Sequence, residues 1–221
     1  PQNYQLGAGD NLIIDIWGAS QETYEEKVTP EGNIIIDNIG PIYLSGLTIE
    51  EATIKIKKAL SNIYAGIYDG STFMKISLGA VRSIKVNIVG DVNTPGSYTL
   101  TSLATVFNAL YMAGGTSVNG TLRNVKVIRE NKTIAVIDIY DFLLKGEQKN
   151  NIRLQDQDIV FVSPYNARVE IQGEIKRPGY YDMQSGETLS DLVYFAGNYT
   201  GKAYWRWIKV LRKNGIENHV F

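Results

Sequence analysis

The sequence contains no cysteine and only one histidine, His219. Without cysteine the chain has no disulfide, no thiolate zinc site and no cysteine nucleophile. A histidine metal site or a Ser-His-Asp triad would depend on His219 alone, and we expect that residue to be a solvated surface side chain. We therefore predict no metal, no cofactor and no catalytic centre.

Long apolar runs are also missing. No stretch approaches the roughly 18 to 20 apolar residues of a membrane-spanning helix, and the start at Pro1 shows neither a charged segment nor the apolar segment of a signal peptide. We expect a trimmed chain whose membrane association depends on segments outside this sequence. Since 44% of the residues are hydrophobic, the chain is rich enough in apolar side chains to build a packed core.

An excess of positive charge is absent as well. Lys and Arg number 22, Asp and Glu number 23, and the formal net charge is -1. Proteins that bind nucleic acid by neutralising phosphates usually carry a basic excess or a basic stripe. The sequence has neither, so we predict no nucleic-acid partner.

A repeat organises the second part of the chain. Residues 86–132 align with residues 169–215 at a constant offset and without a gap, and "VNIVGDVNTPGSYTL" lies over "VEIQGEIKRPGYYDM". Chance does not keep register over that length. We place an N-terminal domain at residues 1–84 and two copies of one module at residues 85–166 and 167–221. We expect the second copy to be truncated, because its last strands would follow Phe221.

Each copy is predicted to be a small α+β roll. In the first copy the alternation around Val86 and Ile88 predicts a strand, and Gly90 allows a bend. Pro95-Gly96 is typical of a type II turn, in which glycine takes a positive φ. A second strand and a short helix from Val106 follow. Further strands are expected at 125–128, 134–139 and 159–162.

The N-terminal unit has its own pattern. Residues 12–17 predict a strand with alternating faces, "TPEGNIIID", "IGPIYLSG" and "STFMKISL" predict further extended segments, and "LTIEEATIKIKKALSNI" predicts a helix. Thr48 and Glu51 have the spacing of a capping box at the start of that helix, and Thr188 and Asp191 repeat the spacing in the second module. The fold class is therefore α+β.

These ordered motifs resemble a known family. "YQLGAGDNLIIDIWG" with "VTPEGNIIIDNIGPIYLSGLTIEEA" is similar to the polysaccharide biosynthesis/export domain of Wza-type outer-membrane proteins. The repeats resemble SLBB (soluble-ligand-binding β-grasp) modules. The residues of the family motifs are Gly7, Gly9, Asp10, Gly32, Gly40, Gly46, Thr48, Glu51, Gly90, Pro95, Gly96, Gly173, Pro178 and Gly179.

The resemblance implies a non-catalytic periplasmic part of a lipoprotein at the outer membrane of a Gram-negative bacterium. Its expected partners are a capsular polysaccharide or exopolysaccharide chain, an inner-membrane polysaccharide co-polymerase and further copies of itself in a ring-shaped channel. The lipid-bearing cysteine and the C-terminal amphipathic helix of such proteins are absent from this sequence. Truncation or a different route across the outer membrane would explain the missing helix.

The segment Gly7-Ala8-Gly9-Asp10 has two interpretations. A phosphate-binding loop of the P-loop type follows a strand and continues into Lys, whereas here the glycines precede a strand and no Lys follows. The pattern favours a turn in which the Asp10 carboxylate accepts backbone N–H groups. Asp10 with Asp15, or Glu25 with Glu26, could instead form the carboxylate pair of a polysaccharide-hydrolysing enzyme. We expect Asp15 to be a solvated carboxylate on the outer face of its strand.

Two further groups of residues suggest contacts. Tyr204, Trp205 and Trp207 could stack on sugar rings or pack at an interface, either with a neighbouring subunit or with a following part of the chain. Arg123 and Arg206 occupy equivalent positions in the two modules, on a strand face expected to be solvated or to meet acidic groups of a neighbouring subunit. The alternative to an export channel is an envelope module that binds a glycan or another ligand and forms no conduit.

Overall fold

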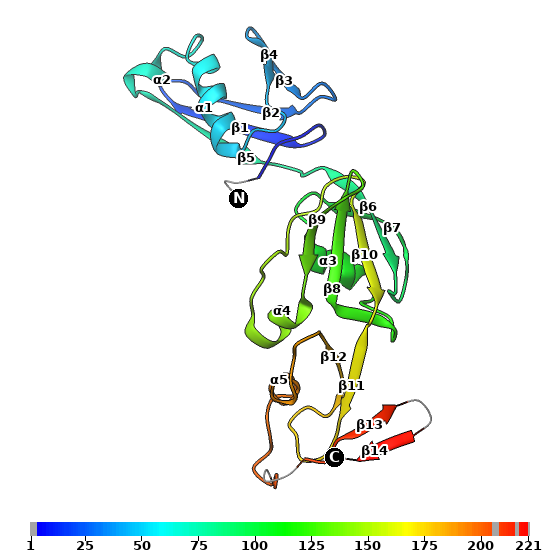
Figure 1. Ribbon diagram of the computed structural model, residues 1–221. Helices are drawn as coiled ribbons and strands as arrows, with labels where there is room; N and C mark the ends of the chain where they lie inside the picture. Colours follow the sequence, from blue (N-terminus) through cyan, green and yellow to red (C-terminus); the bar gives the residue numbers. More distant parts are fainter. Residues whose placement is uncertain (1–3, 205–207, 215–216, 221) are drawn as a thin grey trace. The chain divides into compact units, whose positions relative to one another are not determined.

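The computed structural model describes residues 4–204, 208–214 and 217–220. The chain divides into two compact units. The first holds the chain up to Val86 with Ser97–Thr105 and Arg153–Gln157, and the second holds Asn87–Gly96, Val106–Ile152 and the chain from Asp158. Short helices and mixed sheets confirm the α+β class (Figure 1). Within the described ranges, no helix is both long and apolar enough to cross a membrane.

A three-stranded antiparallel sheet in the order β2-β1-β5 frames the N-terminal part of the first unit, and β3 and β4 form a separate hairpin. Alternation along the central strand buries Leu12, Ile14 and Ile16 on one face and leaves Trp17 on the other. The elements are β1 (Asn11–Gly18), β2 (Glu22–Lys27), β3 (Asn33–Ile36), β4 (Gly40–Tyr43), α1 (Ile49–Leu60), α2 (Gly66–Asp69) and β5 (Thr72–Leu78).

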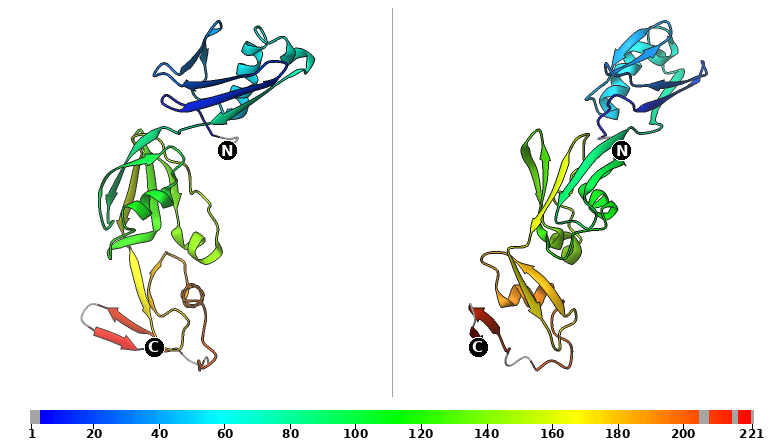
Figure 2. Two further views of the ribbon diagram at one scale, coloured as in Figure 1. Left: turned by 180° about the vertical axis from the view of Figure 1, so that it is seen from behind. Right: turned by 90° about the vertical axis from the view of Figure 1, so that its right-hand side faces the viewer.

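Helix α1 covers the apolar face of this sheet (Figures 1 and 2). Its buried residues Ala52, Ile56 and Leu60 join the same core as the buried side chains of β1 and of the β3–β4 hairpin. The predicted capping box is present: the Thr48 hydroxyl accepts from the Glu51 amide at 3.2 Å, and Glu51 accepts from the Thr48 amide at 2.8 Å. The start of α1 is thus fixed by its own sequence.

The following part of the chain builds a five-stranded sheet in the order β7-β6-β10-β8-β9. Strands β10 and β6 run parallel, whereas β10 with β8 and β8 with β9 run antiparallel, so the sheet is mixed. Its elements and helices are β6 (Ser83–Gly90), β7 (Gly96–Thr101), α3 (Val106–Met112), β8 (Gly120–Arg129), β9 (Lys132–Ile137), α4 (Ile139–Lys145) and β10 (Ile159–Pro164).

The second copy repeats the opening of the first. Equivalent bridges join Val92 to Thr116 and Ile175 to Tyr199, and equivalent loop hydrogen bonds run from Thr94 N to Ala113 O and from Arg177 N to Ala196 O. Helices α3 and α5 also occupy equivalent positions. The elements of the second copy are β11 (Ala167–Ile171), β12 (Gly179–Met183), α5 (Leu189–Phe195), β13 (Leu211–Asn214) and β14 (Glu217–Val220).

Several local predictions need correction. Strand β2 and helices α2 and α4 were not expected, and Ile139 begins α4 rather than ending a strand. Gly96 is the first residue of β7 and is not among the glycines with positive φ. The sharp bend is at Gly90, where φ is 89° and an added Cβ would lie 2.0 Å from the carbonyl oxygen of Val162.

Candidate functional site

Asp10 is the centre of a buried polar cluster in the first unit. Its side chain is fully buried and accepts the Gly7 amide at 2.9 Å, the Arg82 amide at 2.9 Å and the Tyr4 hydroxyl at 2.7 Å. The Arg82 guanidinium adds an ion pair at 2.6 Å. The prediction that Asp10 accepts backbone N–H groups is confirmed, and the cluster supplies two side-chain partners in addition.

The cluster extends to a more distant segment of the same unit. The hydroxyl oxygens of Tyr4 and Ser102 lie 2.5 Å apart, and the Ser102 amide donates to the Arg82 carbonyl at 3.0 Å. Burial raises the pKa of Tyr4 to about 12, so the phenol stays protonated and can donate to Asp10. A Cβ added at Gly7 would lie 2.8 Å from the Arg82 guanidinium carbon, so a larger residue there would displace this guanidinium from Asp10.

This geometry leaves Asp10 no role as a reactive carboxylate. Four hydrogen bonds occupy its two oxygens, and a fully buried group has no access to a substrate. Asp15 lies on the part-exposed face of β1, where it accepts from the Thr23 hydroxyl at 3.1 Å. The two carboxylates are therefore used differently: Asp10 organises a turn, and Asp15 faces solvent.

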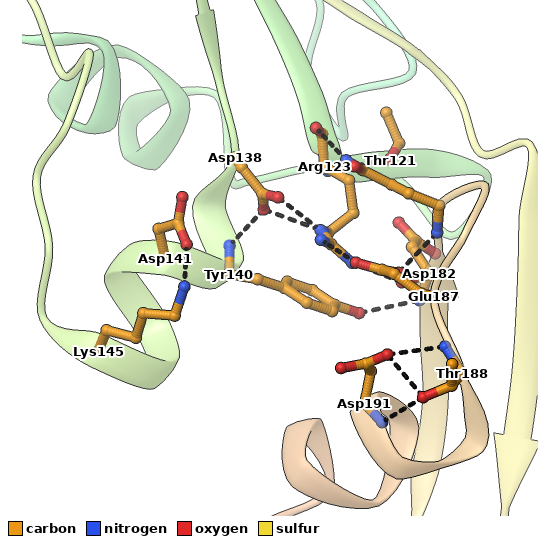
Figure 3. A network of polar contacts seen from close by, with 11 residues as sticks. Thr121, Arg123, Asp138, Tyr140, Asp141, Lys145, Asp182, Glu187, Thr188 and Asp191 are labelled. Carbon is orange, nitrogen blue, oxygen red and sulfur yellow. Dashed lines mark hydrogen bonds and ion pairs between the residues drawn. The ribbon is translucent and has the colours of Figure 1, made fainter.

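Arg123 is the centre of a second polar cluster, which lies in the second unit and joins the two repeated modules (Figure 3). The side chain is 8% exposed; its Nε lies 2.8 Å from Asp138 of the first module, and its Nη2 lies 2.7 Å from Glu187 of the second. Nη1 donates to the Asp182 carbonyl at 3.1 Å. One guanidinium therefore binds groups from both modules.

Aromatic rings enclose this guanidinium. Its carbon lies 4.5 Å from the centroid of Tyr140 and 5.1 Å from that of Phe195, distances typical of cation–π contacts. Burial opposes the charge of Arg123, but the hydrogen bonds and the charges of Glu187 and Asp138 outweigh burial and raise the pKa of Arg123. The guanidinium therefore stays charged although it is buried.

Asp182 is the centre of the other half of the contact between the two modules, and we call the Arg123 and Asp182 contacts together the joint. Its carboxylate accepts from Arg168 at 2.7 Å and from the Leu122 amide at 3.0 Å, and its own amide donates to the Tyr140 hydroxyl at 2.9 Å. Arg168 also donates to the carbonyl of Gly120 at 3.1 Å. The carboxylates have geometrically suited partners, which is the condition under which buried charges stabilise rather than weaken a contact.

These contacts revise the prediction for Arg123. Its charge does not lie on a solvated strand face, because intrachain carboxylates already bind it; we assign it to the contact between the modules. Tyr204 is 65% exposed. Trp205, Arg206 and Trp207 lie outside the described residues.

The family-motif glycines lie where the chain turns. Among them, positive φ angles occur at Gly9, Gly32, Gly40, Gly46, Gly90, Gly173 and Gly179. Pro95-Gly96 and Pro178-Gly179 lead into β7 and β12. Throughout the described part of the chain, no group of three or more histidine and carboxylate side chains is suited to hold a metal ion.

Sequence reasoning missed most partners of both clusters. Arg82 lies outside the quoted motifs, and Tyr4 opens one of them without a role that the pattern assigns. Asp138 had a detectable signal, because it directly precedes α4 and caps it by accepting from the Tyr140 amide at 2.9 Å. Asp182 and Glu187 stand where the first module has uncharged residues, and that difference between aligned copies is a usable signal.

Three family models match successive parts of the chain. Residues 1–68 match the model of the polysaccharide biosynthesis/export protein family, and residues 84–162 and 168–218 each match an SLBB domain model. Over 219 residues the chain is 26% identical to two polysialic acid transport proteins KpsD of Escherichia coli, an alignment that covers 97% of this chain and 38% of each relative.

A further relative is the EPS I polysaccharide export outer membrane protein EpsA of Ralstonia nicotianae. It is 25% identical over 221 residues, which cover 88% of this chain and 56% of the relative. The chain therefore spans 38% to 56% of the length of these curated relatives.

Proposed function

Because this chain consists of a polysaccharide biosynthesis/export domain followed by two SLBB domains, we propose that it is the periplasmic part of an outer-membrane polysaccharide export protein. The observation that carries the proposal is the ordered set of three matched domains. Relatives that span the same order are named as transport or export proteins for polysialic acid and EPS I polysaccharide. The expected cargo is a capsular polysaccharide or exopolysaccharide chain in a Gram-negative envelope.

The proposed mechanism is passive. Copies of the full-length protein assemble in a ring that lines a translocation channel, and an inner-membrane co-polymerase supplies the chain and its direction. Two features of the structure support a mechanical rather than a catalytic role. The Asp10 carboxylate is buried in a turn, and its oxygens are fully hydrogen-bonded. Arg123 connects the SLBB modules through buried ion pairs that restrict movement between them. Such a joint lets two small modules act as one stiff element.

Assembly of the full-length protein tests the ring. Analytical ultracentrifugation and electron microscopy in detergent should show a closed oligomer, and a heterologous contact between copies closes by rotation. A strictly monomeric particle would contradict the channel. Deletion of the gene should abolish surface polysaccharide and leave the polymer inside the cell, whereas the Asp15→Asn variant should restore export because that carboxylate faces solvent.

The second candidate is an envelope module that binds glycan without conducting it. A cleft between the SLBB modules, described below, favours this reading as a companion function. The two candidate functions predict different amounts of surface polysaccharide in the deletion strain. A normal amount would contradict the export function and would be compatible with the binding function.

A further inference from the structure

A cleft lies where the two SLBB modules meet, beside the Arg123 cluster. Its volume is about 400 Å³, and its walls include Tyr140, Leu143, Arg177, Tyr180, Tyr181 and Phe195. The first module contributes α4, and the second contributes the loop before β12, β12 itself and α5. Clefts that bind small ligands commonly measure roughly 300 to 1,000 Å³ and are lined by aromatic and apolar side chains with a few polar groups.

The inner wall of the cleft is held in place by the ion pairs described above. The rings of Tyr140 and Phe195 pack edge to face with centroids 5.3 Å apart, and Arg123 contacts both. The Tyr140 hydroxyl accepts the Asp182 amide at 2.9 Å, which fixes the ring from its other end. The wall is therefore preorganised, and a ligand would not have to order these side chains.

The outer wall offers flat aromatic surface to solvent. Tyr180 is 67% exposed and lies opposite Glu170 on the paired strand β11. Tyr181 donates from its hydroxyl to the Arg177 carbonyl at 2.7 Å, which orients its ring. The exposed ring of Tyr180 offers an apolar face suited to the C–H groups of a sugar ring.

Arg177 carries the single formal charge among the residues that line the cleft. One of its amino groups donates to the Phe195 carbonyl at 2.9 Å, which orients the guanidinium. Within the described ranges no carboxylate forms an ion pair with it, whereas Asp138 and Glu187 are already paired with Arg123. The charge that the cleft offers to a ligand is therefore positive.

We propose that this cleft binds a carboxylate-bearing sugar residue of a polysaccharide chain. The apolar face of the sugar packs on Tyr180, and the planar guanidinium of Arg177 binds the carboxylate through two parallel hydrogen bonds. The class of ligand rests on the proposed export function, whereas the cleft, its fixed wall and its charge are features of the structure alone. The inference places recognition of acidic polymers at the joint between the SLBB modules.

Titration of the full chain with defined oligosaccharides tests the proposal. A tetrasaccharide of glucuronic acid and a neutral glucose tetrasaccharide serve as probes, followed by calorimetry and by NMR shifts. We expect saturable binding of the acidic probe that weakens with added salt. The Arg177→Gln variant should bind it about tenfold to a hundredfold more weakly, because charge-assisted hydrogen bonds contribute about 1.5 to 3 kcal/mol.

Matched variants distinguish the effect of the cleft residues on binding from the effects of net charge and of any exposed tyrosine ring. Lys176→Gln removes the neighbouring cation outside the cleft, and Tyr111→Ala removes a tyrosine of α3 that is 85% exposed. Both should bind like the parent chain, whereas Tyr180→Ala should weaken binding. Equal binding of acidic and neutral probes, no saturable binding, or an unchanged affinity of Arg177→Gln would each overturn the proposal.

The experiment also distinguishes this inference from the export function. Full-length protein that exports polymer while neither it nor the chain binds the acidic probe would overturn the cleft and leave export intact. Specific binding together with normal surface polysaccharide in the deletion strain would support the cleft and contradict export.

Discussion

Replacement of Asp10 by Ala should strongly destabilise the first unit. The substitution leaves the Gly7 amide and the Arg82 amide without their acceptor, and each buried donor that loses its partner costs about 1 to 3 kcal/mol. Tyr4 keeps Ser102 as a partner, and the Arg82 side chain, at 26% exposed, can turn to water. We therefore expect a loss of about 3 to 5 kcal/mol, a large part of the about 5 to 15 kcal/mol of a typical domain.

Urea unfolding measures this loss. With Trp205 and Trp207 replaced by Phe, the fluorescence comes from Trp17 of the first unit alone. The midpoint for Asp10→Ala should fall with little change in slope. Asp15→Asn is the control, since its carboxylate is part-exposed and accepts from the Thr23 hydroxyl at 3.1 Å, and we expect a loss of less than about 0.5 kcal/mol. Equal midpoints for Asp10→Ala and its parent would refute the reasoning.

Three further predictions concern Arg123, Glu51 and Tyr4. Arg123→Ala leaves Asp138 without its cation and should lower the free energy of unfolding of the second unit by about 3 to 5 kcal/mol. Hydrogen exchange measures this loss, and unchanged protection of the backbone amides in both modules would contradict the joint. Hydrogen bonds from Thr48 hold the pKa of Glu51 below its usual 4.5, so the stability that this carboxylate gives to α1 is present above that value and lost as the pH falls through the lowered pKa. Thr48→Ala keeps the backbone amide that donates to Glu51 and removes the hydroxyl that also donates to it, so in an NMR titration the pKa of Glu51 should rise part of the way to its usual value; an unaltered titration would count against the capping box. Burial raises the pKa of Tyr4 from 10.0 to about 12, so the stability that its neutral phenol gives is present below pH 10 and lost as the pH rises through 12; in the ultraviolet titration Tyr4→Phe should lower the amplitude of the late part of the curve, where other buried tyrosines also titrate, and leave the earlier part unchanged.

The parts of the fold that the sequence predicts are those set by local residues. Strand β1 follows from the alternation of Leu12, Ile14 and Ile16, and α1 follows from a capping box and a helical apolar stripe. Strand β2 escaped prediction because it is a polar edge strand with no buried residue, so no apolar alternation marks it. Helix α4 was missed because it is short and because the strand predicted at 134–139 was extended past its cap, Asp138.

The candidate site was less predictable for a different reason. Asp10 was identified as a turn residue from its neighbours in the sequence. Arg82, which forms the ion pair with its buried carboxylate, lies far along the chain in a segment without a motif. Arg123 was singled out because both copies share it, yet its surroundings depend on Asp138 and Glu187. Periodic sequence patterns predict a helix or strand and the residues that flank it. They do not predict which charged residues from distant parts of the chain form ion pairs.

Alignment of the repeats did not reveal the joint between the modules, and the residues that form the joint explain why. Alignment rewards positions at which the copies agree, such as Gly90 with Gly173, and those positions maintain the fold of each copy. A contact between the copies needs complementary and therefore different groups: the first module supplies the buried cation Arg123, and the second supplies the Glu187 carboxylate, where the first has Ala104. The Asp182 carboxylate, where the first module has Thr99, accepts the Leu122 amide of the first module. The carboxylates of the second module that make this contact are thus found among the differences of the repeat, and the cleft proposed to hold an acidic sugar opens beside them.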